Sequence, residues 1–111
     1  MRASKDYKEF YDKHINIIRS TKSVCLECGK RLKGRYDEVA HVLPKSKFKS
    51  IAKRDDNIIY LCRDCHGKYD NESNESINKM NIFPIVSNMA RFLLDIVQEK
   101  FNYKVKERWQ I

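Results

Sequence analysis

The sequence predicts a small α+β fold, and three observations support this prediction. Near each end of the chain, apolar residues recur every three or four positions, which is typical of amphipathic helices. Between these stretches lie short runs of β-branched and apolar residues, which favour strands. Two pairs of cysteines bracket the runs. With 111 residues the chain has the length of one domain, so we expect a single domain over residues 1–111.

Residues 1–22 are expected to form an N-terminal helix. From Lys5 to Arg19, aromatic and aliphatic side chains recur at the spacing of one helix face. This face comprises Tyr7, Phe10, Tyr11, His14, Ile15 and Ile18. Nothing in the pattern gives His14 a chemical role, and it fits an ordinary core or surface position. The polar segment Ser20–Ser23 ends the helix.

Residues 23–72 are expected to form the central core. The segment Lys30–Leu43 predicts a β-hairpin whose second strand ends at Pro44, because proline cannot donate a ladder hydrogen bond. The apolar segment Asp56–Leu61 predicts another strand that leads into the second cysteine pair. A short helix is expected to begin at Cys65.

Residues 73–111 are expected to form a linker followed by a C-terminal helix. The segment Asp70–Asn81 is rich in Asn, Ser and Glu, which is typical of a loop. Pro84 then opens an amphipathic helix, since its fixed φ suits the first helical turn. The apolar face of this helix comprises Ile85, Val86, Met89, Phe92, Leu93, Ile96, Val97 and Phe101. Such a face predicts core packing, or a contact with a second copy of the chain or another protein.

Composition and charge exclude several classes of protein. The chain is 41% hydrophobic and 34% charged, which is too apolar for a disordered chain and too charged for a membrane protein. The longest apolar-rich stretch, Ile82–Val97, is interrupted by proline and charged residues, so we expect no membrane span. The N-terminal residues do not lead into the apolar run of a signal peptide, so we expect a cytoplasmic location. A net charge of +8 favours a nucleic acid partner.

The cysteines form two Cys-x-x-Cys knuckles with 33 residues between them: Cys25 and Cys28, then Cys62 and Cys65. Four thiolates at this spacing are typical of a closed, structural zinc site. A reducing cytoplasm disfavours disulfides, and neither knuckle lies in the strand–helix–strand pattern of a redox pair. A plain zinc ribbon separates its knuckles by roughly 15–20 residues. The longer gap here leaves room for a chemical site between the knuckles.

Three segments of this region carry a known pattern: Ala40–Pro44 (AHVLP), Asp56–Cys62 (DNIIYLC) and Cys65–Asp70 (CHGKYD). Together they resemble the HNH endonuclease family, in the branch that is stapled by a zinc ion. The resemblance implies a ββα-metal core, in which a β-hairpin packs on a helix around one divalent ion. It also implies hydrolysis of DNA phosphodiester bonds.

The resemblance implies a role for each polar residue of the pattern. His41 corresponds to the general base, and a histidine with a reference pKa of about 6.5 suits that task at neutral pH. Asn57 is expected to orient His41 by bonding across the loop. His66 and Asp70 are four residues apart on a helix and face the same side, so together they suit a Mg²⁺ or Mn²⁺ ion.

One position departs from the family pattern. The family often places an acidic residue or a histidine directly before the first histidine, as a further ligand of the catalytic ion, and here Ala40 takes that place. Glu38 lies on the same face of the expected strand and is a candidate ligand. The departure keeps a second function class open, that of a non-catalytic zinc-binding module that holds nucleic acid or a protein.

A run of cations follows the strand that ends at Pro44. Such a run is either a solvated face or a contact with the DNA backbone, and phosphate contacts supply affinity without sequence information. The candidate DNA-binding residues are Lys45, Lys47, Lys49, Lys53 and Arg54.

Overall fold

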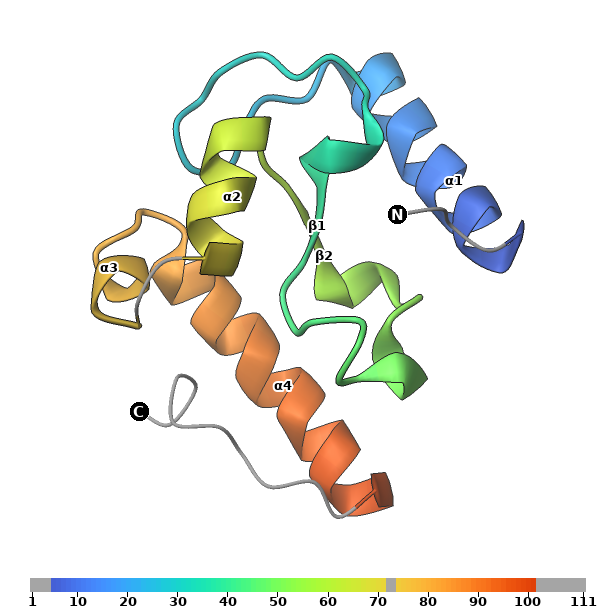
Figure 1. The fold of residues 1–111 in the computed structure, drawn as a ribbon, viewed down its shortest axis with the longest axis vertical. Helices are drawn as coiled ribbons and strands as arrows, with labels where there is room; N and C mark the ends of the chain where they lie inside the picture. Colours follow the sequence, from blue (N-terminus) through green and yellow to red (C-terminus); the bar gives the residue numbers. More distant parts are fainter. Residues whose placement is uncertain (1–4, 72–73, 102–111) are drawn as a thin grey trace. The chain divides into compact units, whose positions relative to one another are not determined.

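The structure is a computed structural model that describes residues 5–71 and 74–101. In this part of the chain it contains four α-helices and a two-stranded sheet (Figure 1). The elements are α1 (Lys5–Thr21), β1 (Val39–His41), β2 (Ile58–Tyr60), α2 (Arg63–Asn71), α3 (Asn74–Asn78) and α4 (Phe83–Phe101). Three short 3₁₀ turns connect them, at Tyr36–Glu38, Lys49–Ile51 and Asp55–Asn57. The α+β prediction is therefore confirmed.

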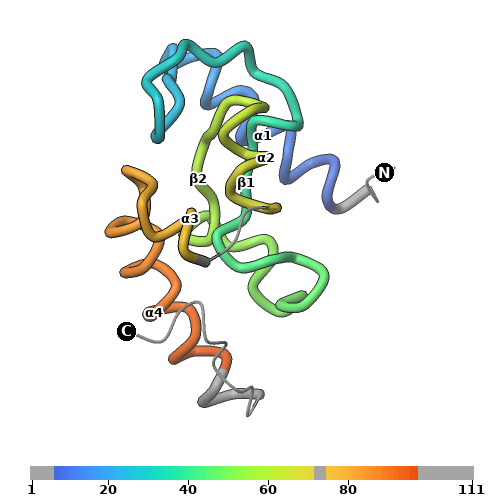
Figure 2. Tube along the Cα trace, turned by 60° about the vertical axis from the view of Figure 1, so that its left-hand side comes forward, coloured from blue at the N-terminus to red at the C-terminus, as the bar shows by residue number. Residues whose placement is uncertain are grey.

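The chain divides into two compact units. The first unit comprises Met1–Ala40 and Ile59–Glu72, and the second comprises His41–Ile58 and Ser73–Ile111. The tube in Figure 2 shows the chain leaving β1, turning back on itself and returning through β2. The two strands are antiparallel: in the first unit the Leu61 N–H donates to the Glu38 carbonyl, and in the second the Val42 N–H donates to the Asn57 carbonyl.

The first helix, α1, forms as its sequence predicts. The predicted residues Phe10, Tyr11, His14, Ile15 and Ile18 are all buried, with exposed fractions of 8% or less. The helix ends after Thr21, where Lys22 adopts a left-handed φ of 53° and the Ser23 N–H donates to the Ile18 carbonyl. This arrangement is a Schellman motif, which satisfies carbonyls at the end of a helix.

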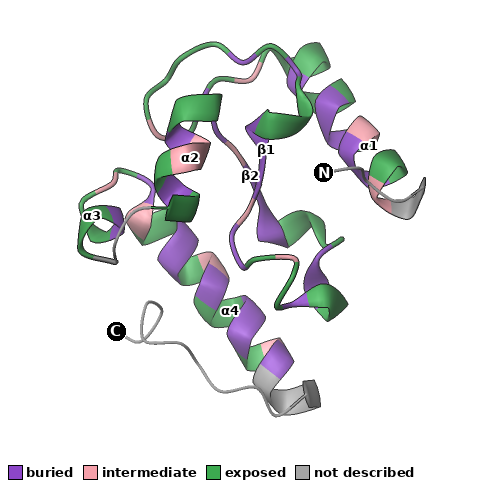
Figure 3. Cartoon of the chain, viewed as in Figure 1, coloured by how far each residue is buried: buried purple, intermediate pink, exposed green. Residues whose placement is uncertain are grey.

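The C-terminal helix α4 begins where Pro84 predicts, but its buried face differs from the predicted one. Figure 3 shows a buried stripe along α4, made of Val86, Ala90, Leu93, Leu94 and Val97. Two members of the predicted face are exposed instead, Ile85 by 44% and Phe92 by 54%. The predicted face was too wide, since eight apolar residues cover more of the helix than its unit buries. The side chain of Phe101 lies outside the described residues.

Two further expectations are wrong. The segment Lys30–Leu43 is not a hairpin: β1 pairs with β2, and residues 24 and 31 form only an isolated bridge. The segment Asp70–Asn81 is not simply a loop, because it contains the end of α2 and the short helix α3. Ile77 in α3 is fully buried, and this single apolar anchor explains why a polar segment is ordered. Within the described residues, no helix is both long enough and apolar enough to cross a membrane.

Candidate metal centre and active site

The four cysteine side chains converge in the first unit. Their sulfur atoms all lie within 4.8 Å of one another, and those of Cys28 and Cys62 are 3.8 Å apart. Zinc–sulfur bonds of about 2.3 Å in a tetrahedral site separate the sulfur atoms by about 3.8 Å, so the cluster fits one zinc ion. All four thiols are unbridged. The geometry therefore agrees with the predicted metal site and not with disulfides.

Each knuckle is a tight turn closed by a backbone hydrogen bond. In the first knuckle the Gly29 N–H donates to the Cys25 carbonyl at 2.9 Å, and Gly29 has the positive φ of 78° that this turn requires. In the second knuckle the His66 N–H donates to the Cys62 carbonyl at 2.8 Å, within the first turn of α2. The sequence thus builds the two halves of the site from a glycine turn and a helix start.

The thiols of the cluster differ in acidity. Burial raises the pKa of the Cys25 thiol, but three backbone N–H groups outweigh this effect and lower its pKa to about 7, those of Cys28, Cys62 and Glu27. Burial and the neighbouring thiols both raise the pKa of Cys65. Thiolates repel one another at this distance, and a divalent cation between them relieves the repulsion.

Helix α2 also carries the pair His66 and Asp70. The Nδ1 atom of His66 donates to the Asp37 carbonyl at 2.6 Å, and its Nε2 atom lies 3.1 Å from Oδ2 of Asp70. Two adjacent ligands of an octahedral ion with bonds of about 2.1 Å lie about 3 Å apart. The pair therefore has the separation that two ligands of one divalent ion need.

A proton and a metal ion compete for the space between these two side chains. The hydrogen bond with Asp70 raises the pKa of His66, against the opposing effect of burial, and the Asp37 carbonyl raises it further. Positive charge beside Asp70 is thus favoured, either as the protonated imidazole of His66 or as a bound metal ion. Two protein ligands are common for Mg²⁺, which keeps several water molecules and phosphate oxygens in its coordination shell. Within residues 5–71 and 74–101, only the cysteines bring together three or more His, Cys, Asp or Glu ligand atoms.

Glu38, the candidate third ligand, is occupied by other contacts. Its buried carboxylate accepts hydrogen bonds from the backbone N–H groups of Lys33, Gly34 and Arg35, at 2.7 to 3.0 Å. Gly34 has a φ of 81°, which helps three successive N–H groups point at one anion. A metal ion would have to compete with all three for Glu38.

His41 lies in the second unit, at the end of β1. Its Nε2 atom is 2.9 Å from the carbonyl oxygen of Ala52. Because a carbonyl oxygen only accepts hydrogen bonds, Nε2 carries the proton of the neutral ring, and Nδ1 carries the lone pair. The hydrogen bond with Ala52 thus selects one tautomer of His41.

Asn57 is fully buried in the same unit and clamps the chain beside His41. Its Oδ1 accepts from the Leu43 N–H at 2.8 Å, and its Nδ2 donates to the Leu43 carbonyl at 3.1 Å. Both polar ends of the amide therefore bind one residue across the loop. Asn57 fixes the backbone two residues after His41 and does not touch the imidazole in any contact that the structure describes.

The predicted run of cations is also in the second unit, and its members differ. Lys47, Lys49 and Lys53 are exposed, and Lys45 is half-buried. Arg54 makes two hydrogen bonds to Asp56, at 2.8 and 2.9 Å, so its charge already has a partner. Its guanidinium also lies 6.0 Å from the centre of the Phe92 ring.

Sequence patterns did not indicate two of the groups that orient these histidines. They are the backbone carbonyls of Asp37 and Ala52, which bond His66 and His41. Every residue type has a backbone carbonyl, so the sequence carries no signal for such a contact. Each unit holds part of the predicted site: the cysteines, His66 and Asp70 in the first, and His41 and Asn57 in the second.

Comparison with known proteins supports the family resemblance of the central region. The family model of the HNH endonuclease matches residues 25–72, which include both knuckles, His41, Asn57 and His66. No curated protein and no solved structure matches the chain significantly. The matched segment and the converging cysteines agree with the resemblance seen in the sequence. Residues 25–72 of this chain are therefore similar to the HNH endonuclease family, and their four converging cysteines match the form that has two Cys-x-x-Cys knuckles.

Proposed function

We propose that the chain is a metal-dependent HNH endonuclease that hydrolyses phosphodiester bonds of DNA. The observation that carries this proposal is the pair of contacts made by His66, inside a segment that matches the family. One ring nitrogen donates to a backbone carbonyl while the other faces a carboxylate 3.1 Å away. Metal-binding histidines characteristically donate their second ring N–H to a carbonyl or a carboxylate in this way.

His66 and Asp70 are the proposed ligands of the catalytic Mg²⁺ or Mn²⁺ ion. When bound, such an ion supplies positive charge to the scissile phosphate and to the leaving oxygen. Glu38 is not included, because its carboxylate already accepts three backbone hydrogen bonds. Imidazole and carboxylate together suit divalent first-row ions.

His41 is the proposed general base. Its Nδ1 accepts a proton from the water that attacks phosphorus, while the bond from phosphorus to the leaving oxygen breaks. The hydrogen bond from Nε2 to the Ala52 carbonyl supports this role, because it leaves the lone pair of a neutral ring on Nδ1. Asn57 is a positioning residue, since it fixes the backbone that follows His41.

The remaining predictions concern structure and partners. We propose that Cys25, Cys28, Cys62 and Cys65 hold a structural zinc ion, and that Lys47 and Lys49 contact the DNA backbone. A homodimer or protein contact through α4 stays a prediction, and the exposed Ile85 and Phe92 favour it. A single domain and a cytoplasmic location also stay predictions.

Ala40 favours one alternative, a zinc-binding module that binds nucleic acid or a protein without cutting. A plasmid-nicking assay separates the two functions. We expect the zinc-loaded protein to nick supercoiled DNA with Mg²⁺ or Mn²⁺ and to bind without nicking when the divalent ion is omitted. Omission is preferable to chelation, because a chelator also removes the zinc. DNA binding without nicking under all metal conditions would favour the module.

A further inference from the structure

A hollow of about 210 Å³ opens beside the second knuckle, within the first unit. Five cations line it against three carboxylates: Lys30, Arg31, Lys33, Arg35 and Arg63 against Asp37, Glu38 and Asp64. All five cations are exposed, and in the described part of the chain none of them forms an ion pair. The hollow therefore concentrates positive charge that no ion pair of the described residues neutralises.

The carboxylates of the hollow compensate this charge only in part. The Glu38 carboxylate already accepts hydrogen bonds from three backbone N–H groups, and of the five cations only Arg35 contributes to lowering its pKa. Asp37 and Asp64 remain, and both are exposed to water. The cations outnumber them, and an anion in the hollow would meet a net positive field.

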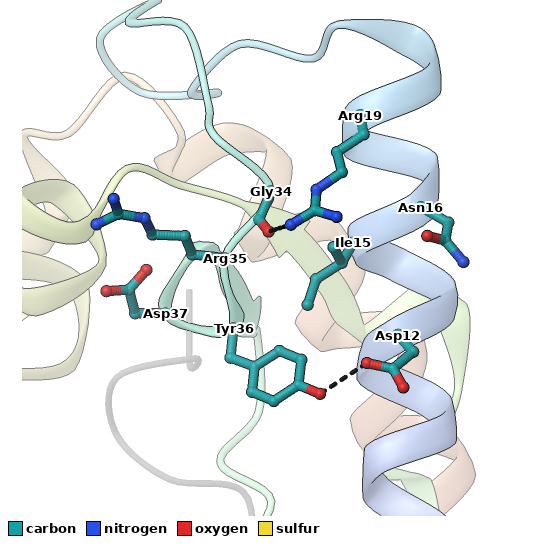
Figure 4. A pocket seen from close by; sticks show the side chains of 8 residues that line it. All are labelled: Asp12, Ile15, Asn16, Arg19, Gly34, Arg35, Tyr36 and Asp37. Atoms are coloured by element: carbon teal, nitrogen blue, oxygen red, sulfur yellow. Dashed lines mark hydrogen bonds between the residues drawn. The ribbon is translucent and has the colours of Figure 1, made fainter.

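The segment that carries these cations is held in place. Figure 4 shows the Tyr36 ring and the Gly34 carbonyl facing α1, where they bond Asp12 and Arg19, while Arg35 extends to the other side of the segment. The backbone of Arg31 pairs with Val24 in an isolated bridge. Cations on a fixed backbone lose less conformational freedom when they bind an anion.

The size of the hollow suits a phosphate group. Sites for drug-sized molecules have volumes of roughly 300–1,000 Å³, so a hollow of 210 Å³ is small for such a ligand. A larger hollow of about 750 Å³ lies between α1 and residues 34–37. Two of its four charged residues are already engaged, since Asp12 accepts from Tyr36 and Arg19 donates to Gly34, and the other two, Arg35 and Asp37, also line the smaller hollow. The smaller hollow is the one in which cations outnumber carboxylates.

The hollow also adjoins the proposed metal ligands. Arg63 precedes His66 by three residues on α2, so the two side chains lie on one face of that helix. Asp37 lines the hollow, and its backbone carbonyl accepts the hydrogen bond from His66. We propose that the hollow binds a backbone phosphate of the DNA strand, next to the phosphate that is cut. This inference rests on the proposed nuclease function.

Two alternative roles for these cations predict different results. Four thiolates around one zinc ion carry net negative charge, and nearby cations would stabilise it. However, exposed side chains are screened by water, so this stabilisation is weak. An acidic protein is a second occupant that the same cations would fit.

The test compares two double variants of equal net charge. Lys33→Gln with Arg63→Gln removes two cations from the hollow, and Lys8→Gln with Lys79→Gln removes two exposed cations elsewhere. DNA affinity is measured over a series of salt concentrations without divalent ion, and zinc content is measured for each protein. We expect the hollow variant to reduce the slope of log Kd against log salt concentration by about one, for the one phosphate that is lost, and the control to reduce it much less. Lys33→Arg with Arg63→Lys keeps the charges and should bind like the parent.

Three outcomes would overturn the inference. An unchanged salt dependence with zinc retained would favour an acidic protein as the occupant of the hollow. An unchanged salt dependence with loss of zinc would show that these cations stabilise the zinc site. An equal effect of both double variants would show only the loss of net charge. These results are distinguishable from failure of the proposed function, in which the parent protein itself does not nick DNA.

Discussion

The two units position their functional side chains in different ways. In the first unit, ligands that converge come from neighbouring positions on one turn or one helix, as in Cys25 and Cys28 or in His66 and Asp70. In the second unit, the contact that the structure shows for His41 is with a carbonyl 11 residues away, and His66 has a similar contact with a carbonyl 29 residues away. Spacing along the chain therefore predicts the ligand pairs of the first unit, whereas the backbone contacts of both histidines depend on how the chain folds back.

The zinc cluster gives the largest expected effect. Assembly of such a site is coupled to folding and contributes on the order of 10 kcal/mol, which is comparable to the total stability of a small domain. We expect one zinc ion per chain and a large fall in Tm when a strong chelator removes it. Metal analysis and thermal melting measure the two. The same chelator saturated with zinc beforehand is the control and should leave Tm unchanged.

One result would contradict the role of zinc in the first unit. If the reduced protein contains no zinc and melts at the same temperature with and without chelator, the cysteines do not hold the first unit together.

Substitution of the two histidines gives the next largest effect. It distinguishes the proposed base in the second unit from the proposed metal ligand in the first. His41→Ala should slow nicking by roughly 10²–10⁴-fold, because it removes the proposed base. His66→Ala should also abolish nicking, but by weakening the catalytic ion, so excess Mn²⁺ should partly restore it. Excess Mn²⁺ should not restore His41→Ala, since a metal ion does not replace the missing base. Nicking rates over a Mn²⁺ series measure this difference.

Both variants should keep the zinc content and DNA affinity of the parent, which serves as the control for folding. Nicking at the parent's rate by both variants would reject the nuclease assignment and leave the binding module.

The same contrast explains how far the sequence predicts this molecule. Apolar periodicity was sufficient for α1, and proline marked the start of α4, because both depend on local rules. The hairpin prediction over Lys30–Leu43 failed because residues 30–32 pair with residues 23–25 instead, and β1 pairs with the distant β2. The exposure of Phe92 was not predictable either, since it depends on how much of α4 its own unit covers. Local patterns predict elements and ligand pairs, and tertiary contacts decide the rest.

Glu38 tests whether the first unit also depends on a backbone contact. Burial raises the pKa of Glu38, but the N–H groups of Lys33, Arg35 and Gly34 and the Arg35 cation lower it below its usual value of 4.5. A carboxyl with a lowered pKa stabilises the folded state above its unfolded pKa, and this stabilisation is lost as pH falls through the folded pKa. Glu38→Gln should therefore cost about 1–3 kcal/mol at pH 7 and progressively less below pH 4.5.

Denaturant unfolding of parent and variant at several pH values measures this difference. Glu9→Gln, a change at an exposed site on α1, is the control and should have little effect at any pH. A cost for Glu38→Gln that does not vary with pH would mean that packing, and not the charged hydrogen bonds, explains it.

The lysine run gives the smallest expected effect, because exposed charges affect DNA affinity without affecting fold or chemistry. Lys47→Ala with Lys49→Ala should reduce the salt dependence of log Kd by about two units, one for each lost phosphate contact. An unchanged salt dependence would assign the run to solvent. The combination with Lys33→Gln and Arg63→Gln then compares the units directly. If DNA contacts both the run in the second unit and the hollow in the first, the two reductions should add, since separate phosphates release separate counterions. If the reductions do not add, the DNA does not contact the two surfaces independently.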